Sequence, residues 1–130
     1  MISRRSILFA LAASSLAFAM PVQAEEVPPF TQQAFEAAQQ AGKPILIEVH
    51  ADWCPTCRAQ APILGKLTDD AKFKDMTVLR VDFDTQKDVC KQFGANSQST
   101  LIVFKGAVEA GRSLGDTNPV SLAALLDKAI

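Results

Sequence analysis

The sequence has few of the features that mark several common classes of protein. It contains only three cysteines in 130 residues, too few for a small domain held together by a framework of disulfides. Its 13 Lys and Arg nearly balance its 14 Asp and Glu, which argues against nucleic acid as a partner, because phosphate binding needs a basic surface. It has no internal repeat and no low-complexity linker. A content of 48% hydrophobic and 21% charged residues is that of one globular domain.

The amino terminus has the three-part pattern of a secretory signal peptide. A basic start, Ser3-Arg4-Arg5, precedes an uncharged run of about 14 residues over 7–20, and Val22-Gln23-Ala24 follows as a cleavage site. The run is shorter than the roughly 20 residues of a membrane-spanning helix, although an uncleaved anchor is the alternative. We therefore expect residues 1–24 to be a cleaved signal peptide and residues 25–130 to form a soluble domain in the periplasm. The paired arginines leave both the Sec and the twin-arginine export routes open.

Apolar periodicity predicts alternating helices and strands in the rest of the chain. An extended segment with Pro28-Pro29 comes first. Helices are then expected over 31–41, 55–67, 86–93 and 119–129, and strands over 45–49, 77–83, 101–105 and 108–113. Strands separated by helices pair in parallel, whereas the last two strands, joined around Gly106, form an antiparallel hairpin. The predicted fold class is α/β, with a central mixed sheet of about four strands flanked by helices.

Two cysteines, Cys54 and Cys57, stand where a predicted strand ends and a helix begins. Free backbone N–H groups and the helix dipole favour an anion there, so Cys54 is expected to ionise more easily than a free thiol. The spacing lets the two sulfurs meet within one helical turn and form a disulfide. We expect Cys54 to be the exposed nucleophile that forms a mixed disulfide with a partner, and the deeper Cys57 to resolve it.

Two structural interpretations compete with this redox role. The pair could be half of a zinc site, but such a site needs four ligands, and only His50 and Cys90 remain, at unsuitable spacing. The pair could also be a purely structural disulfide, but a bridge across two intervening residues constrains the unfolded chain very little. We therefore predict a redox-active pair in a protein without a resident metal or cofactor.

The segment Ala51-Asp52-Trp53-Cys54-Pro55-Thr56-Cys57 resembles the active-site segment of the thioredoxin family. The similarity continues over residues 45–49, at Phe93-Gly94, over residues 100–106 and at Gly115. It implies a thioredoxin-like fold and a protein disulfide oxidoreductase, and we expect a monomer. The expected docking residues for a substrate are Trp53, Pro55, Thr56, Gln98, Ser99, Thr100 and Gly115.

Glu48 lies in the middle of an otherwise apolar predicted strand. Burial of a carboxylate is costly unless the group is paired or protonated. The family has a buried acid at the matching position, which implies that Glu48 is an acid/base catalyst that takes the proton from Cys57. The alternative is that Glu48 lies at the rim of the sheet and pairs with Arg80.

The sequence departs from the family in the loop before residue 100. Thioredoxins carry there a cis-proline that faces the cysteines, and the alignment puts Ser99 at that position. A cis bond before a non-proline residue costs roughly 2.5–4 kcal/mol, so we expect a trans Gln98–Ser99 bond or a reshaped loop. Because the family's proline also keeps metal from the thiols, its absence makes a Cu(I)-binding chaperone that uses the same thiolates the alternative function.

The resemblance also bears on the direction of electron flow. Gly42-Lys43-Pro44 and residues 51–54 are similar to thioredoxin-like domains that work beside membrane electron carriers. This implies reduction of disulfides in exported proteins, including apocytochromes in cytochrome c biogenesis and copper-site assembly proteins, with electrons from a membrane thiol carrier. A disulfide oxidant or isomerase is the competing enzyme, because the residues between the cysteines help to set the potential.

His50 and Cys90 are the remaining residues with reactive side chains. We interpret His50 as a surface or packing residue and Cys90 as a buried small hydrophobe. A role of His50 in tuning Cys54, and a regulatory or dimer-forming role of Cys90, are the alternatives.

Overall fold

The computed structural model describes residues 18–19 and 26–130. The predicted signal peptide over residues 1–24 lies outside these described residues, apart from 18–19, and stays a prediction. The elements follow the order α1 (Gln32–Gln40), β1 (Pro44–His50), α2 (Pro55–Asp69), the short 3-10 helix η1 (Ala71–Phe73), β2 (Thr77–Asp82), α3 (Lys87–Gln92), β3 (Thr100–Lys105), β4 (Val108–Leu114) and α4 (Pro119–Asp127). The predicted order of helices and strands is confirmed, with η1 added. Within the described residues, no helix has the length and apolar character needed to cross a bilayer.

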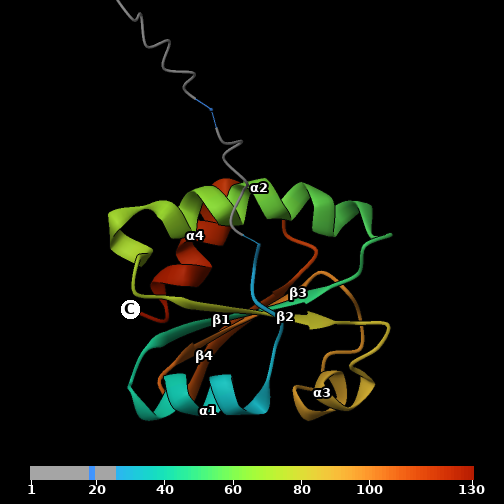
Figure 1. Ribbon diagram of the computed structural model, residues 1–130, viewed down its shortest axis with the longest axis horizontal. Coiled ribbons are helices and arrows are strands. Elements are labelled where there is room, and N and C mark those ends of the chain that lie inside the picture. Colours follow the sequence, from blue (N-terminus) through green and yellow to red (C-terminus); the bar gives the residue numbers. More distant parts are fainter. Residues whose placement is uncertain (1–17, 20–25) are drawn as a thin grey trace, which may run out of the picture.

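The four strands form one mixed sheet in the order β2-β1-β3-β4. β1 pairs in parallel with β2 and antiparallel with β3, and β3 forms a hairpin with β4. Helices α2 and α4 cover one face of the sheet, and α1 and α3 cover the other (Figure 1). This arrangement is the predicted α/β class. The central strand β1 is buried from residue 45 to residue 49, as expected for a strand covered on both faces.

Side chains cap the two helices that begin and end the domain. Thr31 accepts the backbone N–H of Ala34 at 3.1 Å at the start of α1. Asn118 accepts the N–H of Val120 at 2.8 Å at the start of α4, where Pro119 is the first helical residue. These caps satisfy N–H groups that a helix leaves free at its first turn. The local sequence therefore determines where these helices begin.

Two apolar clusters, one on each face of the sheet, hold the layers together. In the first cluster four phenylalanine rings pack with centroids 5.1 to 5.9 Å apart. These are Phe30, Phe35, Phe93 and Phe104. The second cluster includes Leu46, Leu64, Leu101, Leu122 and Leu126. Each buried side chain of this size contributes about 1.5–3 kcal/mol, and the two clusters together hold β1 between the helical layers.

A short stretch before α1, residues 28–30, pairs with the outer edge of β2, and we call it the edge segment. The Phe30 N–H donates to the Arg80 carbonyl at 2.7 Å, and the Arg80 N–H donates to the Pro28 carbonyl at 2.9 Å. Pro29 is thereby the parallel bridge partner of Arg80. The extended segment predicted from Pro28-Pro29 therefore covers part of a strand edge that would otherwise be open.

Candidate active site

Cys54 and Cys57 stand at the start of α2, where the chain leaves the carboxyl end of β1. Cys54 is the N-cap residue, and its Sγ accepts the backbone N–H of Cys57 at 3.1 Å. Pro55 lies in the first turn of the helix, where a missing N–H costs no helical hydrogen bond. As predicted from the position of the motif, a sulfur lies at the positive end of a helix dipole with a backbone N–H directed at it.

Both cysteines are buried, so the expectation of an exposed Cys54 is wrong for the free protein. The exposed fraction is 1% for Cys54 and 3% for Cys57. Cys54 turns inward to cap α2, and Ala51 and Phe83 pack against the pair. All three cysteines are free thiols, so this is the dithiol form, and the Cys54–Cys57 disulfide of the oxidised form stays a prediction. A partner disulfide has to dock on the residues around the pair before it can reach a sulfur.

The pKa of the Cys57 thiol is raised above its ordinary value. The main cause is burial, which penalises the thiolate, and the hydrogen bond with the Cys54 sulfur raises the pKa further. Backbone groups of Ala51 and Ser99 act in the opposite direction and lower it. Cys57 therefore keeps its proton at neutral pH, which suits a thiol that reacts second.

Trp53 provides a large exposed apolar surface next to the thiols. The residue is 55% exposed, and its Nε1–H donates to Asp84 Oδ2 at 2.8 Å. Asp84 lies in the loop after β2, so this bond connects the turn before α2 with that loop. Pro55 is exposed beside Trp53, and Thr56 is half-buried. These three predicted docking residues therefore form one accessible surface beside the pair.

The Glu48 carboxylate is buried and paired with Arg80. Glu48 is 6% exposed and lies opposite Arg80 in the parallel register of β1 and β2. Arg80 Nε and Nη2 donate to Glu48 Oε2 at 3.3 and 3.1 Å. The pairing named as the alternative is therefore present, although the carboxylate is buried and not at the rim. The neighbour of the Cys57 sulfur on β1 is the Val49 carbonyl at 4.0 Å, and proton transfer by Glu48 stays a prediction.

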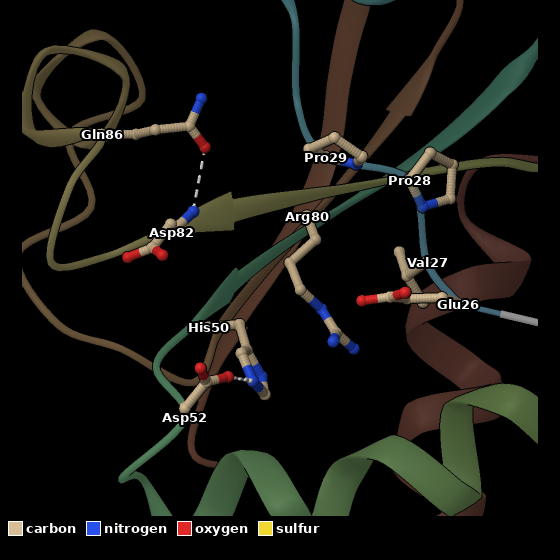
Figure 2. Close-up of a pocket in the computed structure, with 9 residues that line it drawn as sticks. All are labelled: Glu26, Val27, Pro28, Pro29, His50, Asp52, Arg80, Asp82 and Gln86. Atoms are coloured by element: carbon tan, nitrogen blue, oxygen red, sulfur yellow. Dashed lines mark hydrogen bonds and ion pairs between the residues drawn. The ribbon is translucent and has the colours of Figure 1, made fainter.

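A polar groove of about 450 Å³ opens beside this ion pair, between the edge segment, β2 and the turn before α2 (Figure 2). Arg80 reaches into it from β2, and His50 lies beside it at the end of the neighbouring strand β1. The His50 side chain is 16% exposed, and its Nε2 lies 3.2 Å from Asp52 Oδ1. The remaining lining residues are Glu26, Val27, Pro28, Pro29, Asp82 and Gln86. His50 is thus held at the surface of the groove beside the site, in line with its interpretation as a surface or packing residue, and a role in tuning Cys54 stays a prediction.

The loop before β3 closes over the site with its backbone. The described residues contain no cis peptide bond, so the Gln98–Ser99 bond is trans as predicted, and Ser99 has a left-handed φ of 61°. The Ser99 N–H donates to the Val49 carbonyl at 2.8 Å, and its carbonyl accepts the Gly115 N–H at 3.0 Å. Ser99 and Thr100 are buried and Gln98 is half-buried. The second group of predicted docking residues therefore also comes together.

Gln60, a buried amide on α2, was not among the predicted site residues. Gln60 is 3% exposed, and its Nε2 donates to the Asp116 carbonyl at 2.9 Å and to the Ser99 carbonyl at 3.4 Å. A signal was present, because Gln60 is the polar member of a buried stripe with Cys57 and Leu64 at helical spacing. Nothing in the local sequence indicated that Asp84 would accept the hydrogen bond of Trp53.

Cys90 and a set of metal ligands were the other chemical candidates considered from the sequence. Cys90 is 4% exposed and packs in the phenylalanine cluster, which confirms its interpretation as a packing residue. Burial raises the pKa of its thiol, more than nearby Lys87 lowers it, and a thiol of this kind is poorly reactive. In the part of the chain that the structure describes, no three His, Cys, Asp or Glu side chains are grouped to hold a metal ion.

Comparison with known proteins agrees with this geometry. The family described as Thioredoxin matches residues 26–128. The chain is 34% identical over 84 residues to thioredoxin of Chlamydia muridarum, covering 65% of this chain and 80% of that protein. It is also 34% identical over 118 residues to a probable protein disulfide-isomerase A6 of Medicago sativa, covering 87% of this chain but only 32% of that longer protein.

Solved structures share the same architecture. Trxlp from Edwardsiella tarda is 42% identical with a TM-score of 0.75, covering 78% of this chain and 98% of that one. Mitochondrial thioredoxin 3 from Saccharomyces cerevisiae is 23% identical with a TM-score of 0.67, covering 78% and 94% respectively, and at that identity it supports the fold alone.

Proposed function

Because the chain belongs to the thioredoxin family and is a thiol-disulfide oxidoreductase of that family, we propose that it reduces disulfides of exported proteins in the periplasm. A membrane thiol carrier would supply the electrons. The observation that carries the proposal is the dithiol pair at the start of α2, with Cys57 kept protonated by burial beside the N-cap residue Cys54. This arrangement provides one thiol that reacts first and one held in reserve.

The reaction is two successive thiol-disulfide exchanges. The Cys54 thiolate attacks one sulfur of the substrate disulfide, and the other substrate sulfur leaves as a thiolate. Cys57 then loses its proton and attacks the Cys54 sulfur of the mixed disulfide, which releases the second substrate thiolate and forms the Cys54–Cys57 disulfide. Two electrons pass to the substrate, and reverse exchange with the membrane carrier returns two electrons to the pair.

The surroundings of Cys54 support the reductive direction. A strong oxidant is one whose reduced form is stabilised, mainly through its nucleophilic thiolate. The Cys54 sulfur accepts the Cys57 N–H at 3.1 Å and is hydrogen-bonded to the Cys57 thiol. The two residues between the cysteines, Pro55 and Thr56, carry no charge. The reduced form therefore lacks a cationic side chain between the thiols that would stabilise it, which favours a reductant.

The periplasmic location is supported by the signal-peptide pattern over residues 1–24. The first described element, α1, begins at Gln32, and the edge segment begins at residue 28. Cleavage after Ala24 would therefore remove none of the described helices and strands. Disulfides persist outside the cytoplasm, so substrates with exposed disulfides, apocytochromes among them, would be available there.

The reduction potential of the pair tests the direction. The protein with Cys90→Ala is equilibrated with thiol-disulfide buffers, and Trp53 fluorescence reports the redox state. A potential of about −270 mV, as in thioredoxin, is the expected result, whereas about −120 mV, as in a strong bacterial oxidant, would overturn the reductive direction.

Cell fractionation tests the location. The full chain and a chain without residues 2–24 are expressed in a bacterium with a periplasm, and the mature mass is measured. We expect the full chain to yield a periplasmic protein that begins at Glu25. Cytoplasmic retention of the full chain, or an uncut chain in the membrane, would contradict the proposal. Replacement of Arg4 and Arg5 by lysine separates the two routes, because it should block only twin-arginine export.

A further inference from the structure

Gln60 is a buried amide in α2, three residues after Cys57, and it connects two separate loops. Its Nε2 donates to the Asp116 carbonyl at 2.9 Å, in the loop between β4 and α4. The same nitrogen donates to the Ser99 carbonyl at 3.4 Å, in the loop before β3. A side-chain amide carries two N–H protons, so both bonds can exist together. The helix that carries the thiols is thereby tied to two loops beside them.

Ser99 needs such a tie because its backbone lies in the left-handed region. A φ of 61° is uncommon for a residue with a Cβ and persists only where the surrounding structure fixes it. Three hydrogen bonds converge on its backbone groups, from its N–H to the Val49 carbonyl and from Gly115 and Gln60 to its carbonyl, and its hydroxyl donates to the Gln98 carbonyl. A proline ring holds φ near about −65° and cannot supply this conformation. In this chain, hydrogen bonds fix the loop.

The Ser99 backbone lies beside the resolving thiol, because the Ser99 N–H and the Cys57 Sγ both approach the Val49 carbonyl, at 2.8 and 4.0 Å. It lowers the pKa of Cys57, while burial, the larger effect, raises it. A small shift of the Ser99 backbone that leaves the loop closed would remove this lowering contribution while Cys57 stays buried. Because Cys57 must lose its proton before it attacks, the position of Ser99 influences the second exchange step.

We propose that Gln60 is a positioning residue for thiol exchange, whose side-chain amide holds Ser99 against Cys57 and so sets how fast Cys57 resolves a mixed disulfide. Gln60 acts through Ser99 and not on the substrate. The inference needs only the thiol-disulfide exchange of the family. It applies to either direction of electron flow and to any cellular location, so it can fail while the proposed function stands.

A symmetric aromatic disulfide with a coloured thiolate product separates the two steps. The Cys54 thiolate attacks one sulfur, forms a mixed disulfide and releases the first aromatic thiolate. Cys57 loses a proton, attacks the Cys54 sulfur and releases the second, leaving the protein disulfide. Both releases are followed by stopped flow across a pH series. The full chain with Cys90→Ala serves as the parent, because its third thiol is then absent.

Gln60→Leu removes the N–H donors while it keeps a similar volume. We expect the first release to be unchanged and the second to slow at neutral pH, with its pH midpoint shifted upward. For each unit by which the pKa rises, the fraction of Cys57 present as thiolate at neutral pH falls about tenfold. A more basic thiolate is also about threefold more nucleophilic. The second release should therefore slow by about three- to fourfold for each unit. At alkaline pH the second release should reach or exceed the parent rate. Gln60→Met, with a more adaptable side chain, provides a second donor-free variant if the leucine variant folds poorly.

Two controls distinguish positioning from general loosening of α2. Thr68→Val removes a side-chain hydrogen bond to the Leu64 carbonyl, 2.9 Å long, in the same helix, and should leave both releases unchanged. Glycine at position 99 adopts the left-handed backbone without strain, so the loop depends less on the Gln60 hydrogen bond. Gln60→Leu should therefore shift the pH midpoint less in the Ser99→Gly protein than in the parent.

The proposal is overturned if the donor-free variants leave the pH midpoint of the second release unchanged. It is also overturned if they slow both releases equally at every pH, or if their effect is the same with serine and with glycine at position 99.

Discussion

The indole N–H of Trp53 donates to the Asp84 carboxylate at 2.8 Å, across 31 residues of sequence. The bond joins the turn before α2 to the loop after β2. It fixes a ring that is 55% exposed, so the apolar surface beside the thiols is held in one orientation. Such a surface loses less side-chain entropy when a partner docks.

Asp84→Ala should free this ring. We expect lower fluorescence anisotropy of Trp53, the single tryptophan of the chain, and a lower kcat/KM for a protein disulfide. A hydrogen bond contributes about 0.5–1.5 kcal/mol, so the loss should be at most about tenfold. Asp84→Asn keeps an acceptor and should be closer to the parent, and Asp88→Ala in α3 is the matched control. Unchanged anisotropy in Asp84→Ala would contradict the prediction.

Ser99→Pro should not restore the loop typical of thioredoxins without cost. Proline cannot adopt the φ of 61° found at this position, and it lacks the N–H that Ser99 donates to Val49 at 2.8 Å. We expect a loss of about 3 kcal/mol in the free energy of unfolding, measured by urea denaturation of the dithiol protein. Ser99→Gly should cost less than about 1 kcal/mol. A proline variant as stable as the parent would mean that the loop adopts another conformation freely.

The two buried thiols make the dithiol protein less stable at alkaline pH. Burial raises the pKa values of Cys57 and Cys90 in the folded state, so the folded chain keeps protons that the unfolded chain has lost. This stabilisation is complete below the ordinary thiol pKa of about 8.5 and is lost as the pH rises toward the folded-state pKa values. Urea unfolding should show the free energy falling above that pH, and a Cys57→Ala, Cys90→Ala double variant should show a flatter dependence. An equal slope in parent and variant would rule out this linkage.

Glu48→Gln tests the role of the buried carboxylate in exchange. It should lower the free energy of unfolding by about 1.5–3 kcal/mol, the usual value for a hydrogen bond to a charged group. The loss should not be larger, because the Arg80 side chain is 26% exposed and water can partly solvate it when its partner is removed. If Glu48 accepts the Cys57 proton, the second release of an aromatic thiolate slows and its pH profile changes, while Glu48→Asp retains part of that profile. A pH profile identical to the parent would assign Glu48 to the ion pair alone.

The sheet and its helices could be predicted because their apolar periods are local properties of the chain. Residues 45–49 form a strand that is buried throughout, and Asn118 with Pro119 specifies a helix start from adjacent residues. The cysteine pair was recognisable for the same reason, since the motif lies at the junction of a strand and a helix. A polar residue in an apolar strand likewise identified Glu48.

The rest depends on contacts between residues distant in sequence. Glu48 meets Arg80 only through the parallel register of β1 and β2, and the carbonyls that Gln60 binds lie 39 and 56 residues further along the chain. The burial of Cys54 follows from its inward turn as a helix cap and from the packing of Phe83. Local patterns contain none of this information.

If the amino terminus is removed as we propose, the edge segment makes the fold sensitive to where that cleavage falls. Phe30 and Pro28 form backbone hydrogen bonds with Arg80 of β2. Loss of a few residues beyond the expected cleavage point would leave these β2 groups unpaired, and β2 could then pair with a strand of another copy. Imprecise proteolysis at the amino terminus would then lead to self-association while the thiols remained intact.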